Sequence, residues 1–226
     1  MEKPVTLDAP LTSLPGIGPQ RAALFARLNV RTVGELLRLY PRTYEDRTRL
    51  VSIASLEAGT PACFEAAVVT TPRTNRIPKP GSRMLEVTKF TVADDTGRLN
   101  LTFFNAAHSA GALRVGERYC FYGVLTGDFA AYGMTNPLFE PCDGPARVTR
   151  RILPVYPLTA GLTNSMVLRA QAQAVSRCAG LLPETLPPEL LRRCGLCGAA
   201  EACREIHCPT SATASGCLAC FMIHAE

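Results

Sequence analysis

Two adjacent aromatic residues at the end of a strand-like run offer the clearest chemistry in this sequence, which is stacking on a flat ring. The run is Gly97–Phe104 (GRLNLTFF), and Asn105 follows it. Because side chains alternate along a strand, Phe103 shares a phase with two leucines, whereas Phe104 shares the other phase with polar residues. We therefore expect Phe103 to be buried and Phe104 to be exposed. The alternative is that a second element covers Phe104.

Four basic side chains could supply the charge that a nucleic acid requires. The segment before Glu86 contains proline, glycine and no acidic residue, and it carries Arg73, Arg76, Lys79 and Arg83. Taken alone, these residues are typical of a solvated loop. Beside an exposed aromatic ring they favour nucleic acid, because cations hold phosphates while a base stack contributes roughly 1–3 kcal/mol. The net charge of +5 is too small to indicate a polyanionic partner by itself.

Six of the ten cysteines lie near the end of the chain and raise the question of zinc. Cys194 and Cys197 form one CxxC pair, and Cys217 and Cys220 form another at a spacing typical of a four-thiolate zinc ribbon. Two further cysteines, Cys203 and Cys208, have no place in such a site. We therefore assign no metal site, although zinc binding by the four thiols of the two CxxC pairs remains an open alternative. We expect His207 to be a packing residue.

Composition limits the class of protein. The chain has 226 residues, of which 47% are hydrophobic, enough for one or two domains. No stretch approaches the ~18 uncharged apolar residues of a membrane span, and the first residues lack the apolar block of a signal peptide. We expect a cytoplasmic monomer that contacts no membrane and keeps its cysteines reduced.

Two short helices are predicted at the start of the chain. Leu14–Pro19 (LPGIGP) predicts a glycine turn, and apolar residues then recur at helical spacing. Thr32 and Glu35 predict a capping box before a second helix, which Pro41 ends. Glycines at this turn allow backbone amides to approach a phosphate, but we prefer the interpretation that they let two helices pack closely.

The middle of the chain predicts strands separated by turns. Five segments have the alternation and spacing of a small barrel of the OB type: Ala62–Thr71, Leu85–Ala93, Gly97–Phe104, Glu117–Leu125 and a short one near Tyr132–Met134. In such a barrel the first loop and the second and third strands bind single strands. The four basic residues lie in that loop. Asp94–Gly97 is expected to be a turn without a catalytic role.

The last third of the chain predicts helices. Pro154–Pro157 is expected to be an extended linker, followed by helices at Asn164–Ala179 and near Pro188–Ile206. The predicted fold class is α+β, with a five-stranded OB-type β-barrel flanked by an N-terminal helical hairpin and a C-terminal helical region. The expected boundaries are 1–50 for the hairpin, 51–145 for the barrel, 146–210 for the helical linker region and 211–226 for a divergent tail.

These motifs resemble the RecG family of ATP-dependent DNA helicases over about residues 10–210. The residues that carry the resemblance are Leu14–Pro19, Thr32-Val33, Leu36-Leu37, Pro41-Arg42, Tyr44–Arg47, Asp95–Gly97, Phe103–Asn105, Gly116, Gly123, Asn136-Pro137, Pro154–Thr159 and Ile206-His207. The resemblance implies a wedge domain that is lodged at the branch point of DNA. It also implies that Phe104 stacks on a base where the parental duplex opens.

The same resemblance sets the remaining expectations. His108 stands where the family commonly has tyrosine, so it would stack with less area. The implied function is structure-selective binding of branched DNA, such as replication forks and Holliday junctions, in recombination and repair near the nucleoid.

No GxxxxGK[ST] loop occurs in this sequence, although a RecG motor requires one to hold ATP and magnesium. We therefore expect a truncated wedge module that binds neither ATP nor magnesium and that is inactive alone. A separately encoded motor is left open as a partner. Two alternatives stay open, a zinc-stabilised protein-interaction fragment and an inactive gene remnant.

Overall fold

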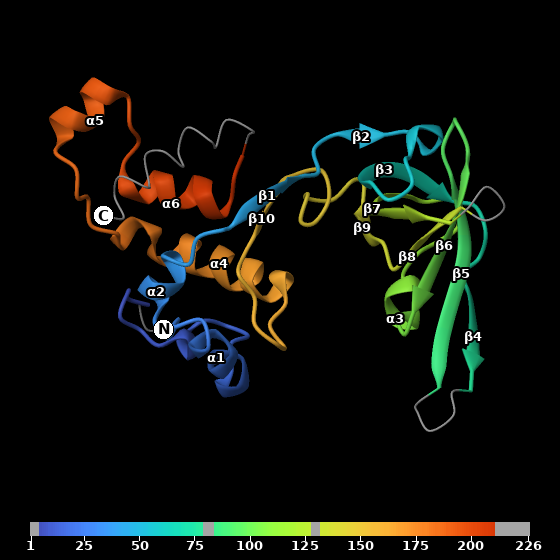
Figure 1. Cartoon of the computed structure of the whole chain (residues 1–226), viewed down its shortest axis with the longest axis horizontal. Coiled ribbons are helices and arrows are strands. Elements are labelled where there is room, and N and C mark those ends of the chain that lie inside the picture. The colour runs from blue at the N-terminus through green and yellow to red at the C-terminus, as the bar shows by residue number, and fades with distance from the viewer. Residues whose placement is uncertain (1–4, 79–83, 128–131, 211–226) are drawn as a thin grey trace. The chain divides into compact units, whose positions relative to one another are not determined.

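The computed structural model of the chain describes residues 5–78, 84–127 and 132–210 (Figure 1). The described residues form two compact units, one drawn from 5–45 and 152–210 and the other from the described part of 46–151. Within these ranges, no helix combines the length and the apolar character that crossing a bilayer requires. Each unit has its own hydrophobic core, and we describe them in turn.

The first unit is helical. It contains the 3-10 helices η1 (Leu11–Ser13) and η3 (Ala179–Leu181) and the α-helices α1 (Pro19–Ala26), α2 (Val33–Leu37), α4 (Asn164–Cys178), α5 (Pro188–Cys194) and α6 (Ala199–His207). The predicted capping box is confirmed at α2. Thr32 Oγ1 accepts a hydrogen bond from the Glu35 amide at 3.2 Å, and the Glu35 carboxylate accepts one from the Thr32 amide at 3.0 Å.

Helix α4 covers α2 and completes the core of this unit. Val167, Ala170 and Ala174 of α4 are buried, in one cluster with Leu36 and Leu37 of α2. Gln171 is also buried, and its Nε2 donates to the carbonyl oxygens at the end of α2 and just beyond it, at 2.7 and 3.2 Å. Because the last carbonyls of a helix have no partner within it, this side chain satisfies groups that burial would otherwise leave unpaired.

The segment that was predicted to be a linker is instead part of this core. Strand β10 (Ile152–Val155) pairs with β1 (Thr43–Asp46), and Tyr156 is fully buried directly after it. The Tyr156 hydroxyl lies 2.8 Å from His207 Nδ1, so the prediction that His207 packs is confirmed. The predicted extended conformation is confirmed by β10, whereas its pairing with β1 was not predicted, because that partner strand lies far away in the sequence.

The second unit is a closed barrel. Its strands are β2 (Leu50–Val51), β3 (Pro61–Val68), β4 (Arg73–Ile77), β5 (Leu85–Ala93), β6 (Arg98–Phe104), β7 (Arg118–Thr126), β8 (Gly133–Thr135) and β9 (Leu138–Pro141), with the short helices η2 (Ile53–Ser55) and α3 (Ala107–Ala110). The order β3-β5-β6-β8-β7 closes through a β3–β7 pairing, and β2, β4 and β9 add to its edges. This confirms the predicted α+β class with a five-stranded OB-type barrel.

Alternation along each barrel strand fills the interior. On β6, Leu99, Leu101 and Phe103 are buried, while the residues between them face outward. The Phe103 ring stacks on Phe90 at a centroid distance of 5.7 Å, and Phe139 meets its edge at 5.8 Å. The barrel interior is thus packed with aromatic rings and holds β6 in one register, because a slip by one residue would expose this whole set.

The turn between β5 and β6 is built on Asp94. Its Oδ1 accepts hydrogen bonds from the amides of Thr96 and Gly97 at 2.7 and 2.9 Å, and its Oδ2 accepts one from the Ile53 amide at 2.7 Å. Partial burial raises the pKa of Asp94, but these hydrogen bonds outweigh it and hold that pKa below its ordinary value. The predicted turn is confirmed, and it orients the strand that ends at Phe104.

The basic segment before Glu86 differs from its prediction. Residues Arg73–Ile77 form strand β4, antiparallel to the first half of β5, rather than a loop (Figure 1). All five β4 side chains are exposed, so the segment lacks the buried alternation that identifies a strand in a sequence. Hydrogen bonding to the edge of β5 forms the strand instead. Lys79 and Arg83 lie outside the described residues.

Candidate nucleic-acid interface

The exposed aromatic lies on one face of the sheet formed by β4, β5 and β6. Directly opposed residues of antiparallel strands point to the same side, so the register defines rows of neighbouring side chains across the three strands. One row is Arg73, Lys89 and Thr102, and the next is Asn75, Val87 and Phe104. We call these six residues the Phe104 face. On this face the two cations, Arg73 and Lys89, lie in the row next to that of the Phe104 ring.

Phe104 is exposed as the alternation predicted. Its exposed fraction is 38%, against 3% for Phe103, which lies in the barrel core. The strand therefore presents an aromatic ring to solvent at the point where its pairing ends. An exposed ring of this size leaves apolar area in water that a stacked base would cover.

Two asparagines hold the backbone on either side of this ring. Asn105 donates its amide to the Glu86 carbonyl at 2.8 Å, and its side-chain oxygen accepts from the Glu86 amide at 3.2 Å. Asn136 Oδ1 accepts from the Phe104 amide at 2.7 Å. Both asparagines have positive φ, 52° and 46°, a conformation that asparagine tolerates better than most residues. The end of β6 is thereby fixed although its ladder stops there.

The predicted basic residues separate into two groups. Arg73 lies on the Phe104 face, whereas Arg76 points to the opposite side of β4 and pairs with Glu86, its Nε 3.1 Å from the carboxylate. Lys89 was missed by the sequence analysis, although it shares the strand phase that faces Phe104, and it is exposed. His108 is exposed in α3, four residues after Phe104.

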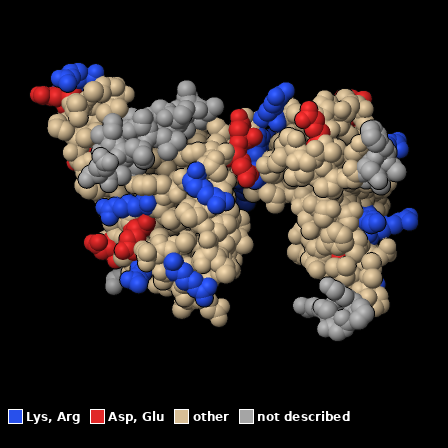
Figure 2. Space-filling view, viewed as in Figure 1, with Lys and Arg blue, Asp and Glu red and all other residues tan. Residues whose placement is uncertain are grey.

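Charge on the barrel unit is spaced rather than continuous. Figure 2 shows lysine and arginine side chains standing singly on the visible side of this unit, with acidic residues between them. The Phe104 face itself contains two cations, Arg73 and Lys89, and no acidic residue. Attraction of a polyanion to this face therefore depends on these two side chains more than on the field of the whole molecule.

A groove of about 700 Å³ continues the Phe104 face across the barrel. Its walls come from β5, β6 and β8, from the start of β4 and the end of β7, and from residues next to these two strands, and they include Arg73, Lys89, Asn100 and Tyr132. The Tyr132 ring is 39% exposed. Stacking rings, cations and amide or hydroxyl groups along one groove suit the binding of a nucleic acid strand rather than bond-breaking chemistry.

The cysteines that prompted the zinc question are only partly described. Cys194, the last residue of α5, is exposed and Cys197 is half-buried, while Cys217 and Cys220 lie outside the described residues, so the question of zinc at these four thiols stays open. Cys203 is fully buried in the helical core. Burial raises the pKa of its thiol to about 12, which suits a packing residue.

Comparison with known proteins gives one consistent family. Residues 11–177 match the family model of the RecG wedge domain. The ATP-dependent DNA helicase RecG of Escherichia coli (strain K12) is 33% identical over 215 residues, which are 90% of this chain and 29% of that protein. The RecG of Thermotoga maritima is 24% identical, over 91% of this chain and 26% of its own length.

A solved structure shows the same fold. The structure described as RecG bound to a three-way DNA junction superimposes with a TM-score of 0.83 at 23% sequence identity, over 96% of this chain and 29% of the other. The chain thus spans less than a third of the length of the relatives that it matches.

Proposed function

The chain belongs to the RecG wedge-domain family, and from that premise we propose that it binds branched DNA through the Phe104 face. The observation that carries this proposal is the exposed Phe104 ring at the end of β6, where two asparagines hold the backbone. Because the backbone that carries the ring is already in place, only side-chain freedom is lost when the ring stacks on a base, which favours binding.

Branched DNA is the ligand class that this arrangement favours. At a branch point the terminal base pair has an exposed face, so one ring can stack on it without unstacking a continuous duplex. The single strand that leaves the junction would follow the groove beside Arg73 and Lys89. The similar RecG structure with a three-way DNA junction supports this choice of ligand.

Selectivity in this proposal comes from shape rather than base sequence. Stacking accepts any base, and the two cations contact phosphates, which carry no sequence information. Affinity should then fall as salt increases, because each phosphate contact releases counterions.

The wider role follows from the family and is also proposed. We infer that the DNA held by this wedge is acted on by an ATP-driven RecG motor that this sequence does not contain, in recombination and repair of replication forks. In this proposal a separately encoded motor supplies that activity. This role places the protein in the cytoplasm, with the nucleoid.

The test replaces Phe104 and measures the affinity of the full chain for a fork and for a plain duplex. Phe104→Ala should weaken fork binding about 5- to 150-fold, which corresponds to the roughly 1–3 kcal/mol of one base stack, and should change duplex binding little. Leu138→Ala is the matched control, because Leu138 on β9 is also an exposed apolar side chain but lies off the Phe104 face. An equal loss of affinity for fork and duplex would show that Phe104 does not recognise the branch point.

A further inference from the structure

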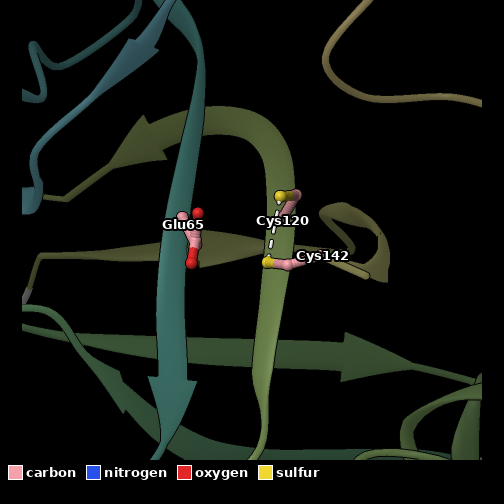
Figure 3. Close-up of side chains that lie close together, drawn as sticks. All are labelled: Glu65, Cys120 and Cys142. Atoms are coloured by element: carbon pink, nitrogen blue, oxygen red, sulfur yellow. Dashed lines mark hydrogen bonds between the residues drawn. The ribbon is translucent and has the colours of Figure 1, made fainter. Parts of the chain in front are cut away.

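A second group of chemically capable side chains lies on the outer wall of the barrel. Glu65 of β3 is directly opposite Cys120 of β7, and both alternate with residues that fill the barrel core, so they point outward. Cys142 follows β9, which pairs with β7 on its other side. Figure 3 shows the three side chains converging, with the two sulfurs joined by a contact of 3.1 Å.

The donor atoms of this group are close enough to share one ion. One carboxylate oxygen and the two Sγ atoms all lie within 4.8 Å of one another. A tetrahedral zinc ion with Zn–S bonds of about 2.3 Å separates its two sulfurs by about 3.8 Å. The present sulfur distance of 3.1 Å therefore needs an increase of about 0.7 Å, which side-chain rotation supplies.

The backbone around Cys142 is already held in place. The Arg150 guanidinium donates to the carbonyls of Cys142 and Gly144, the latter at 2.8 Å. The Glu140 carboxylate accepts from the amides of Arg147 and Val148 at 2.9 and 3.0 Å. The segment after β9 is thus anchored by two charged side chains, and Cys142 is positioned before any ligand arrives.

Charge and access also suit a cation. Arg118 Nε donates to Glu65 Oε1 at 2.7 Å, so a guanidinium already orients the carboxylate, as outer partners of metal ligands do. Two thiolates and a carboxylate would give the ion an excess of negative charge that this guanidinium offsets. Cys120 is fully buried, whereas Glu65 and Cys142 are half-buried, which leaves a way in from solvent.

We propose that Glu65, Cys120 and Cys142 form a binding site for a thiophilic divalent cation, with zinc as the expected ion and water as its fourth ligand. The donor set of two sulfurs and one carboxylate oxygen matches zinc rather than calcium or magnesium, which prefer oxygen alone. Binding releases the two thiol protons. The ion would join β3, β7 and the segment after β9, and so stabilise the wall of the barrel away from the Phe104 face.

Cobalt(II) titration of the full chain under a non-thiol reductant tests the site, since sulfur-to-cobalt charge transfer and tetrahedral d–d bands report the ligands directly. We expect one equivalent of tetrahedral, thiolate-bound cobalt, displaced by zinc, and a rise in the melting temperature with zinc. Cys142→Ser should abolish both bands, and Glu65→Gln should weaken cobalt binding at least tenfold while the thiolate band remains. The double variant Cys194→Ser/Cys197→Ser is the control and should bind like the wild type.

Three results would overturn the proposal. The first is absence of thiolate-bound cobalt in the wild-type chain. The second is a thiolate band that survives in Cys142→Ser. The third is loss of the band in the Cys194→Ser/Cys197→Ser control, which would place the ion at the CxxC pair. Circular dichroism of each variant at the same protein concentration separates loss of the site from loss of the fold.

Discussion

His207 makes the helical unit sensitive to acid, and the size of the effect follows from its surroundings. The imidazole is 1% exposed, with Nε2 2.8 Å from the Leu37 carbonyl and Nδ1 2.8 Å from the Tyr156 hydroxyl. A carbonyl only accepts, so Nε2 carries the proton and Nδ1 accepts from tyrosine. Burial lowers the pKa of His207 from 6.5 to about 4, against a smaller opposing contribution from the Leu37 hydrogen bond.

A histidine with a lowered pKa destabilises the fold as the pH falls. Below pH 6.5 the unfolded chain takes up a proton that the folded chain does not accept until about pH 4. The contribution of His207 is therefore fully present above pH 6.5 and is lost progressively toward pH 4. Proton linkage across this window lowers the free energy of unfolding by about 2 kcal/mol between pH 7 and pH 5.

Urea denaturation followed by circular dichroism at a helical wavelength measures this loss, because among the described residues nearly all α-helix lies in the unit that contains His207. The free energy of unfolding should fall between pH 7 and pH 5 by about 2 kcal/mol less in His207→Gln than in the wild type. In urea, the shift of the unfolding midpoint between the two pH values should then be about 1 M smaller in the variant. His108→Gln, which replaces an exposed imidazole, is the control. If His207→Gln folds poorly, NMR titration of the wild-type imidazole gives the same information. Equal pH effects in wild type and His207→Gln, or a pKa near 6.5, would refute the reasoning.

Two further predictions concern the proposed interface. Asn136→Gly keeps the positive φ but removes the acceptor for the last amide of β6. It should lower the free energy of unfolding by about 1 kcal/mol and weaken fork binding several-fold. Unchanged fork affinity would show that this hydrogen bond does not position the ring. Lys89→Gln should reduce the slope of log affinity against log salt concentration by about 0.7–0.9, because one phosphate contact is lost. Arg76 lies on the opposite face and pairs with Glu86, so Arg76→Gln should leave the slope unchanged. The reverse result would place the phosphate contacts on the other face.

Local patterns in the sequence were sufficient where a structural rule acts over a few residues. Alternation along β6 assigned Phe103 to the core and Phe104 to solvent, and the residues around Thr32 and Glu35 defined a capping box. The number of barrel strands also followed, because each has its own alternation and its own turn. Each of these features leaves a pattern within a few consecutive residues, even where the contacts that it predicts are made to distant parts of the chain.

Features that depend on distant partners were not accessible in this way. Strand β4 has no buried side chain and exists because the edge of β5 accepts it, and β10 requires β1. The position of Lys89 beside Phe104 is a consequence of register between strands, although its phase along β5 was visible in the sequence. The convergence of Glu65, Cys120 and Cys142 likewise needs three strands to be placed.

The most direct test of the central claim compares the wild-type chain on three DNA ligands of equal length, a three-way fork, a plain duplex and a single strand, at one moderate salt concentration with reductant. We predict clearly tighter binding to the fork than to either of the others, with little dependence on base sequence. Equal affinity for fork and duplex, or no measurable binding to the fork, would contradict the account of this chain as a wedge that recognises branched DNA.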